Sequence, residues 1–329
     1  MLIKTRRDFL KVGLKSVAAV GGAGMMAKFA EMNALAAGAP YSALVCVFLG
    51  GGNNGFNTVV PINAGPNTFG MYSTIRQGLA LPQASLLPVT MKNGYQYGLH
   101  SKLPEIQSLF NSGKAAIVAN VGTLVTPTSR NQYLGASVPL PSQLFSHSDQ
   151  TAQWQNVTPS GISSTGWGGR MIDSLQANGQ NATAQFPAIT NTGGCGPFCI
   201  GANSLPTMVP PGGAIGISGV AGNVARTNAV QQLITFDNGL QLVQAANNIL
   251  SKGNTYAGLL NGAIAGLNLS TPFPANNPLA AQLQMVAKII AVRNQLGLTR
   301  QVFYCSRSEE HTSELQSLAY LVCRLLLEK

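Results

Sequence analysis

The stretch from Ala43 to Pro61, ALVCVFLGGGNNGFNTVVP, constrains the fold of this chain more than any other. Its first part, Ala43 to Leu49, is short, apolar and rich in Val and Leu, which predicts a strand buried on both faces of a parallel sheet. Three glycines end the run and allow positive φ and close approach of the backbone to another group. Because ligands of open α/β sheets bind beyond the carboxyl ends of strands, this loop is a candidate site. A tight turn without a ligand explains the loop equally well.

The pattern after this loop also favours an α/β fold. Ser101 is expected to cap a helix that ends near Gly113, and residues 114–121 are expected to form a second buried strand. The order strand, helix, strand predicts a parallel sheet, because crossovers between parallel strands are right-handed. The candidate site at the end of the first strand would be lined by Gly51, Gly52, Asn53, Asn54 and Asn57.

Shorter elements are predicted along the rest of the chain. We expect helices at 71–79, 166–176 and over most of 226–297, with Asn277 as a helix cap. Extended pieces are expected at 86–90, 188–190 and 214–218, and a core strand at 299–306. Residues 177–222 are rich in Gly, Pro, Asn and Thr, which indicates surface elaboration more than core.

Charge is scarce and unevenly distributed. The chain has a net charge of +10, but charged residues make up only 9% of it, far below the roughly 25% of an average domain. Residues 37–306 hold eleven scattered bases and only four acids: Glu105, Asp149, Asp173 and Asp237. No cluster of Lys and Arg interleaved with aromatics is present, so a nucleic-acid groove is not expected. Four carboxylates also limit the metal and acid–base chemistry of this part.

The N-terminal segment matches an export signal. It reads TRRDFLK from Thr5 to Lys11 and continues into a mildly apolar Ala/Gly/Val/Met run, the pattern of a twin-arginine signal peptide. We expect cleavage after Ala36; cleavage after Ala39 is a less favoured position because Pro40 would follow the cut, and an amphipathic N-terminal helix is the alternative to a signal peptide. The predicted partners are therefore the twin-arginine (Tat) translocase and signal peptidase, with a periplasmic or secreted location and no membrane span after cleavage.

The C-terminal segment differs from the rest. Residues 307–317, RSEEHTSELQS, resemble the translation of a widely used sequencing adapter, which indicates that native sequence stops at about Ser306. An amphipathic C-terminal helix is the alternative. The predicted organisation is a signal peptide at 1–36, a truncated domain at 37–306 and a foreign tail at 307–329.

Four of the five cysteines precede that tail. Cys195 and Cys199 lie in a small Gly/Pro loop, and in an oxidising compartment their spacing favours a local disulfide. Cys46 and Cys305 lie in apolar strands and are expected to be buried thiols.

The segment SHSDQTAQW is the best catalytic candidate. Ser146, His147, Ser148 and Asp149 are too close in sequence to form a hydrolase triad, because triad members converge from separate elements. At a helix N-terminus, however, free N–H groups would hold an anion and activate Ser146 or Ser148. Helix capping by Ser146 with Asp149, together with a buried His147, explains the same residues without chemistry, and residue types alone favour it.

Taken together, the motifs resemble one family. TRRDFLK, FLGGGNNGFNTVVP, YGLH, GKAAIVANVGTL, LFSHSDQTAQWQ and GWGGR, in this order, are similar to the exported bacterial proteins grouped as domain of unknown function fifteen-oh-one. That family belongs to the alkaline phosphatase and sulfatase superfamily. The resemblance extends from Thr5 to about Ser306. It implies an α/β fold with a central, mostly parallel sheet flanked by helices, alkaline-phosphatase-like and here incomplete at the C-terminus.

The resemblance also implies a site for a phosphate or sulfate ester. In that superfamily an Asp after the first strand binds a metal, and here that position is Asn54, a poorer ligand for a divalent cation. The segment Ser146 to Asp149 matches the family's Ser-His-x-Asp motif near the nucleophile, so Asp149 is a second metal candidate and Gln150 a lining residue. Zinc, magnesium or calcium would be the cofactor of a full-length member. We expect this chain to hold none and to be inactive. The alternative is a non-catalytic envelope binding or assembly protein.

Overall fold

The computed structural model describes residues 41–50, 53–119, 121–158, 163–212, 215–217, 220, 222–237 and 239–307. The predicted signal peptide, Gly51, Gly52 and the predicted tail beyond Arg307 lie outside these residues.

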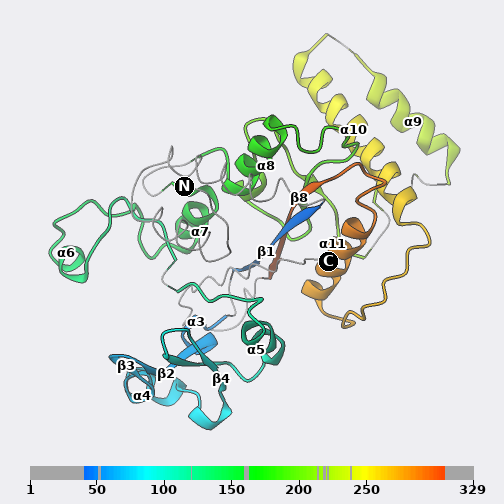
Figure 1. Cartoon of the computed structure of the whole chain (residues 1–329). Helices are drawn as coiled ribbons and strands as arrows, with labels where there is room; N and C mark the ends of the chain where they lie inside the picture. The colour runs from blue at the N-terminus through cyan, green and yellow to red at the C-terminus, as the bar shows by residue number, and fades with distance from the viewer. Residues whose placement is uncertain are drawn as a thin grey trace.

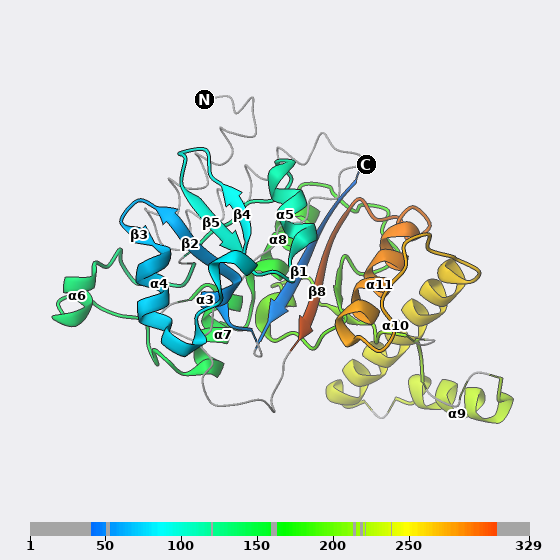
Figure 2. The same cartoon turned by 90° about the horizontal axis from the view of Figure 1, so that it is seen from below.

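Four parallel strands form the main sheet, in the order β1-β8-β6-β7. They are β1 (Ser42–Leu49), β8 (Arg300–Arg307), β6 (Ile189–Asn191) and β7 (Thr207–Met208). Although they come from opposite ends of the described chain, β1 and β8 are neighbours over their whole length (Figures 1 and 2). The predicted α/β class, with a parallel sheet flanked by helices, is confirmed.

The burial of these strands explains their composition. Six consecutive residues of β8, from Arg300 to Cys305, are buried, as expected for a strand covered on both faces. In β1 only Cys46 and Phe48 are buried, because β1 lies at the edge of the sheet. The prediction of a fully buried first strand was therefore wrong in its degree of burial, although its position and direction were right.

Helices cover both faces of the main sheet (Figures 1 and 2). On one face lie α7 (His147–Asn156), α8 (Trp167–Ala177) and the short helix η3 (Pro197–Cys199), and the rings of Trp154 and Phe48 are 5.3 Å apart there. On the other face lies α11 (Pro278–Ala291), whose Gln282 Nε2 donates to Ser306 O at 2.9 Å. Next to α11, α9 (Val224–Thr235) and α10 (Gln241–Ile264) form a protruding helical pair.

A second, antiparallel sheet forms a separate layer, in the order β3-β2-β5-β4. Its strands are β2 (Val59–Ala64), β3 (Asn67–Thr68), β4 (Leu87–Thr90) and β5 (Gln96–Leu99), and α3 (Gly55–Thr58), α4 (Phe69–Arg76), η1 (Gln77–Leu79) and η2 (Gln83–Ser85) accompany them. Residues 53–103 are called the small lobe below. Its core contains Val60, Tyr72 and Leu86. At Gly98 a Cβ would lie 2.6 Å from the Leu86 Cβ, so only glycine allows β5 to approach so closely.

The small lobe was predicted only in part. The helix at 71–79 and the extended piece at 86–90 are confirmed as α4 with η1 and as β4. The remaining strands are two to six residues long and contain Pro and Gly, so they carry too little alternation to be recognised.

Two predictions after the small lobe were wrong. The helix α5 (Pro104–Asn111) begins after Leu103, which occupies the cap position, so Ser101 is not its cap. Residues 114–119 and 121 form no strand, and Val118 is 65% exposed. The chain leaves α5 through Gly113, with φ of +72°, and does not align with any described strand. An apolar run becomes a strand only when a partner supplies backbone hydrogen bonds.

The later helices follow the prediction closely. In α11 Asn277 Oδ1 accepts hydrogen bonds from the N–H groups of Leu279 and Ala280, both at 3.1 Å, and Pro278 occupies the first turn. A five-residue helix, α6 (Arg130–Leu134), lies between α5 and α7. In the described part of the chain, the helices are too short or too polar to cross a bilayer.

The region 177–222 is not mainly surface. Its Ile189, Phe198 and Cys199 are at most 1% exposed and belong to the main core, so the prediction of surface elaboration was wrong. Composition misled here because the backbone of this region packs closely against α8. The expected strand at 188–190 is confirmed as β6, whereas residues 215–217, the described middle of the strand expected at 214–218, form none.

Candidate functional site

Ser146 and Asp149 are held together at the N-terminus of α7. Ser146 is the cap residue, its Oγ accepts a hydrogen bond from the Asp149 N–H at 3.4 Å, and its hydroxyl donates to the Asp149 carboxylate. The Ser148 hydroxyl lies 3.3 Å from that of Ser146. The predicted capping is therefore confirmed. The carboxylate also occupies the positive end of the helix, where it would disfavour a second anion.

His147 takes no part in this arrangement. Its side chain is exposed and makes no hydrogen bond within the described residues, so the structural alternative that placed it in the core was wrong. The segment thus contains a serine–carboxylate pair and not a triad, which agrees with the expectation that residues so close in sequence cannot converge.

The position of α7 is determined by its second half. Gln153, Trp154, Gln155 and Asn156 are all buried, which requires neighbours on every side of the helix. Trp154 packs on Phe48 of β1, and Gln155 Nε2 donates to the buried Tyr304 hydroxyl at 3.3 Å. Ser146 precedes Trp154 by eight residues, so it lies about 12 Å along the helix axis from this anchor, toward the solvent.

Gln150 and its neighbour Gln153 fasten a loop to α7. Gln153 Nε2 donates to Ser142 O at 2.7 Å, and its Oε1 accepts from Thr123 Oγ1 at 3.2 Å. Gln150 Nε2 donates to the same Oε1 at 3.3 Å. Gln150 therefore has a structural role, and Gln153, which was not among the predicted site residues, organises the contact. Its signal in the sequence was its place in the polar segment SHSDQTAQW.

The Asn-rich loop after β1 is also largely engaged by local contacts. Asn57 Oδ1 accepts from the Tyr72 hydroxyl at 2.8 Å, and Asn57 Nδ2 donates to Leu79 O at 3.1 Å. Asn53 Oδ1 accepts from Thr58 Oγ1 at 3.4 Å. Asn54 precedes α3, is exposed and makes no side-chain cap bond. Of the described residues expected to line the site, Asn54 alone presents its amide to solvent.

The two predicted segments lie near the same end of the main sheet. Figures 1 and 2 show α7 and α3 near the carboxyl end of β1. Neither Asn54 nor Asn57 makes a hydrogen bond to Ser146–Gln150 in the described structure. The two segments therefore share one end of the sheet without a hydrogen bond between these residues.

The metal ligands that the family resemblance implies do not fit this arrangement. Within the described residues, no three His, Cys, Asp or Glu side chains are grouped closely enough to hold a metal ion. Asp149 is hydrogen-bonded to Ser146, and Asn54 offers a neutral amide. His100 Nδ1 accepts the Lys102 N–H at 3.1 Å and is occupied in that turn.

The motif GWGGR serves packing. A Cβ at Gly166 would lie 2.1 Å from Pro197 O, and a Cβ at Gly169 would lie 2.1 Å from the carbonyl carbon of Ile200. Arg170 donates to Asn156 O at 2.8 Å and so joins α8 to the end of α7, and burial lowers the pKa of its guanidinium. This motif therefore builds the contact between α7, α8 and the loop at 195–204.

That loop contains the disulfide. The structure joins Cys195 to Cys199, as the spacing predicted. Asn191 Oδ1 accepts from the N–H groups of Gly193 and Cys195, both at 3.1 Å. Asp173 accepts from the Ala202 N–H at 2.6 Å and from the Ser204 N–H at 2.8 Å, so this carboxylate stabilises the loop instead of serving catalysis.

Cys46 and Cys305 are buried free thiols, as expected. Burial raises the pKa of Cys46 to about 12, and burial likewise raises the pKa of Cys305. Cys46 is opposite Tyr304 in the register of β1 and β8, so the two cysteines point to opposite faces of the sheet and do not form a reactive pair.

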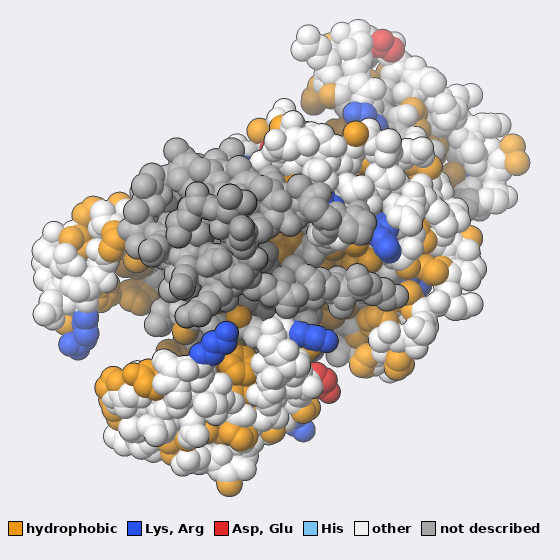
Figure 3. Space-filling model, viewed as in Figure 1, with side chains coloured by type: hydrophobic (Ala, Val, Ile, Leu, Met, Phe, Trp, Pro, Cys, Tyr) orange, Lys and Arg blue, Asp and Glu red, His pale blue; other side chains and the backbone are white. Residues whose placement is uncertain are grey.

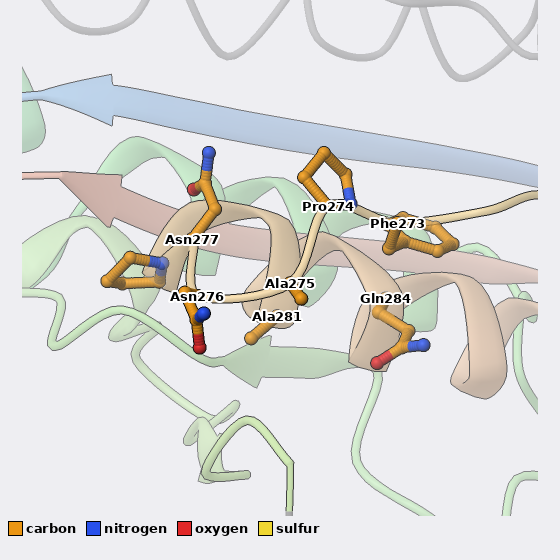
Figure 4. Close-up of a pocket in the computed structure, with 8 residues that line it drawn as sticks. Phe273, Pro274, Ala275, Asn276, Asn277, Ala281 and Gln284 are labelled. Atoms are coloured by element: carbon orange, nitrogen blue, oxygen red, sulfur yellow. The ribbon is translucent and has the colours of Figure 1, made fainter.

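An open groove lies elsewhere, at the beginning of α11 (Figure 4). It is lined by apolar and amide side chains without a charged group: Phe273, Pro274, Ala275, Asn276, Asn277, Pro278, Ala281 and Gln284. The Asn277 amide already caps α11, and α11 is on the sheet face opposite α7. This groove therefore offers no chemistry to the predicted site.

Comparison of the chain with protein-family models, with curated proteins and with solved structures found no match.

Proposed function

We propose that this chain is an exported protein of hydrolase ancestry, of the phosphatase and sulfatase type, and a member of the family of unknown function fifteen-oh-one. The observation that carries the proposal is the serine–carboxylate pair of Ser146 and Asp149 on a helix anchored at the carboxyl end of β1. Ligands of parallel α/β sheets bind at this end. The ordered series of motifs supports the family and its alkaline-phosphatase-like fold.

The pair would supply a nucleophile. The Asp149 carboxylate accepts a hydrogen bond from the Ser146 hydroxyl, and in this position it could take the proton of the serine as the oxygen attacks the phosphorus or sulfur of an ester. A divalent metal would supply charge stabilisation in a complete site. Since the described residues do not provide its ligands, we propose that this chain does not turn over esters.

The direct test measures hydrolysis of an aryl phosphate and an aryl sulfate by the full chain, with zinc, magnesium or calcium added, and metal binding by calorimetry. We expect neither turnover nor stoichiometric metal. Ser146→Ala is the matched variant. Turnover by the unaltered chain that is lost in Ser146→Ala would refute the proposal that the chain is inactive and would establish Ser146 as the nucleophile. Turnover unaffected by Ser146→Ala would refute the assignment of the pair.

A second function is favoured by the exposed Asn54 and by the absence of a metal-ligand group among the described residues. In this second proposal the chain is a non-catalytic envelope protein that binds a partner or glycan through its amide-rich loop. Binding to a glycan array that is lost in Asn54→Ala, without hydrolysis, would support it.

Export through the twin-arginine pathway is part of the proposal. Substitution of both Arg6 and Arg7 by Lys should retain a fused reporter in the cytoplasm, because the pathway recognises this pair. Export of the substituted protein at the normal level would contradict this assignment.

A further inference from the structure

The small lobe has an exposed apolar surface next to the Asn-rich loop. Four large side chains form it, and we call them the apolar patch: Phe56 (55% exposed), Met71 (48%), Ile75 (75%) and Leu79 (55%). Figure 3 shows hydrophobic side chains at the surface over the part of the lobe where α4 and β3 lie. Single exposed apolar residues are ordinary, but a contiguous group indicates an interaction site.

The geometry of α4 brings these side chains together. Tyr72 points into the lobe, where it is 7% exposed, while Met71 and Ile75 are one turn apart on the outer face. At the end of α4 the Arg76 guanidinium lies 5.3 Å from the centre of the Phe56 ring. The backbone of Leu79 is held near Phe56, because the Leu79 carbonyl accepts a hydrogen bond from Nδ2 of Asn57, the residue after Phe56.

The charge around the patch has one sign. Residues 53–104 contain Arg76, Lys92 and Lys102 and no Asp or Glu, and the next carboxylate is Glu105 in α5. Arg76 Nε is buried without a hydrogen-bond partner in the described structure. Lys102 lies in the turn between β5 and α5, and this turn is tied to α3, which carries Phe56, because the His100 N–H donates to Thr58 O at 3.1 Å.

We propose that the apolar patch docks on an anionic lipid bilayer. Phe56, Ile75 and Leu79 would enter the boundary between headgroups and acyl chains, while Arg76 and Lys102 would contact lipid phosphates. A second copy of the chain is a poorer occupant, because two such surfaces would bring together Arg76, Lys92 and Lys102 of both copies, and residues 53–104 supply no carboxylate to pair with them.

The test is flotation of the full chain with vesicles of phosphatidylcholine alone and of phosphatidylcholine containing phosphatidylglycerol. We expect binding to the anionic vesicles, weaker at high salt. Ile75→Ser with Leu79→Ser should lower the partition coefficient about tenfold, and Arg76→Gln about fivefold. The matched control is Val224→Ser with Leu242→Ser, two side chains on α9 and α10 that are 75% and 81% exposed.

The control removes comparable apolar surface far from the patch and should bind as the unaltered chain does. All variants share the same N-terminal segment, so differences between them report the patch, and circular dichroism verifies their fold. Equal binding by the patch variant and the unaltered chain would overturn the proposal. So would self-association that the patch variant abolishes, or capture of an acidic protein partner without vesicle binding.

Discussion

Replacing Gly169 by alanine tests how the GWGGR motif works. The new Cβ would lie 2.1 Å from the Ile200 carbonyl carbon and 2.2 Å from Gly201 N, where a normal contact needs well over 3 Å. The obstacle is backbone, and it is tethered by the Cys195–Cys199 disulfide and by the hydrogen bonds of Asp173, so it cannot move aside cheaply.

The magnitude follows from two opposing effects. Alanine in a helix is favoured over glycine by about 1 kcal/mol, while overpacking costs about 1–3 kcal/mol and more when backbone must shift. We therefore expect Gly169→Ala to lose about 1–2 kcal/mol of unfolding free energy. The matched control is Gly253→Ala in α10, where nothing lies within 4 Å of the new methyl group and a gain of about 0.5–1 kcal/mol is expected.

The assays are urea unfolding and thermal unfolding, each followed by circular dichroism and by tryptophan fluorescence. The chain has two tryptophans, Trp154 and Trp167, whose rings are 5.9 Å apart beside this contact, so the fluorescence reports the affected region. The two variants should differ in melting temperature by about 4 to 10 °C. If Gly169→Ala were as stable as Gly253→Ala, the close packing of α8 on the 195–204 loop would be refuted.

Three further outcomes are expected. Because burial raises the pKa of Cys46 to about 12, the folded thiol keeps its proton at a pH at which the unfolded thiol, with a pKa of 9.0, loses it. The contribution of Cys46 to the free energy of unfolding should therefore be constant below pH 9 and fall between about pH 9 and 12. In urea unfolding, the Cys46→Ala variant should lose less stability over this pH range than the unaltered chain. An identical dependence of stability on pH in both chains would contradict this. Tyr304→Phe leaves the Gln155 amide without its partner and should cost about 1 kcal/mol in urea unfolding, whereas an unchanged midpoint would exclude that hydrogen bond. Reduction of the disulfide between Cys195 and Cys199 should lower the free energy of unfolding by about 2 kcal/mol, as chain entropy predicts for so short a loop. Calorimetry with and without reductant measures the corresponding change in melting temperature. Equal melting temperatures would argue against the bond.

Sequence reasoning was most successful where one segment carried its own signal. The strands β1 and β8 were placed to within one residue at each end, and the start of α11 was placed at its cap, because strong apolar runs and cap residues are local properties. The cap function of Ser146 and the disulfide were foreseen for the same reason. The antiparallel sheet of the small lobe was missed, since its short strands are stabilised by pairing with one another and not by their own composition.

The candidate site shows the same division between local signals, which the sequence carries, and contacts between distant segments, which it does not. The residue types around Ser146 and Asn54 identified two segments of interest, but not what occupies their hydrogen bonds. The engagement of Asn57 by Tyr72, 15 residues away, and of Gln155 by Tyr304, 149 residues away, depends on contacts between distant parts of the chain. The strand expected at 114–121 is absent from the described residues of that run for a related reason, because strand formation needs a partner that the sequence pattern does not specify.

By itself the sequence determined the class of the fold, the main-sheet strands β1, β6 and β8, the caps at Ser146 and Asn277 and the local disulfide, because periodicity and turn chemistry act over a few neighbouring residues. Only the tertiary structure decided that β1 pairs with β8, that His147 is exposed and that the GWGGR glycines meet the backbone of the 195–204 loop. These features arise from packing between segments far apart in the chain, where the free energy of a residue depends on which surface it meets.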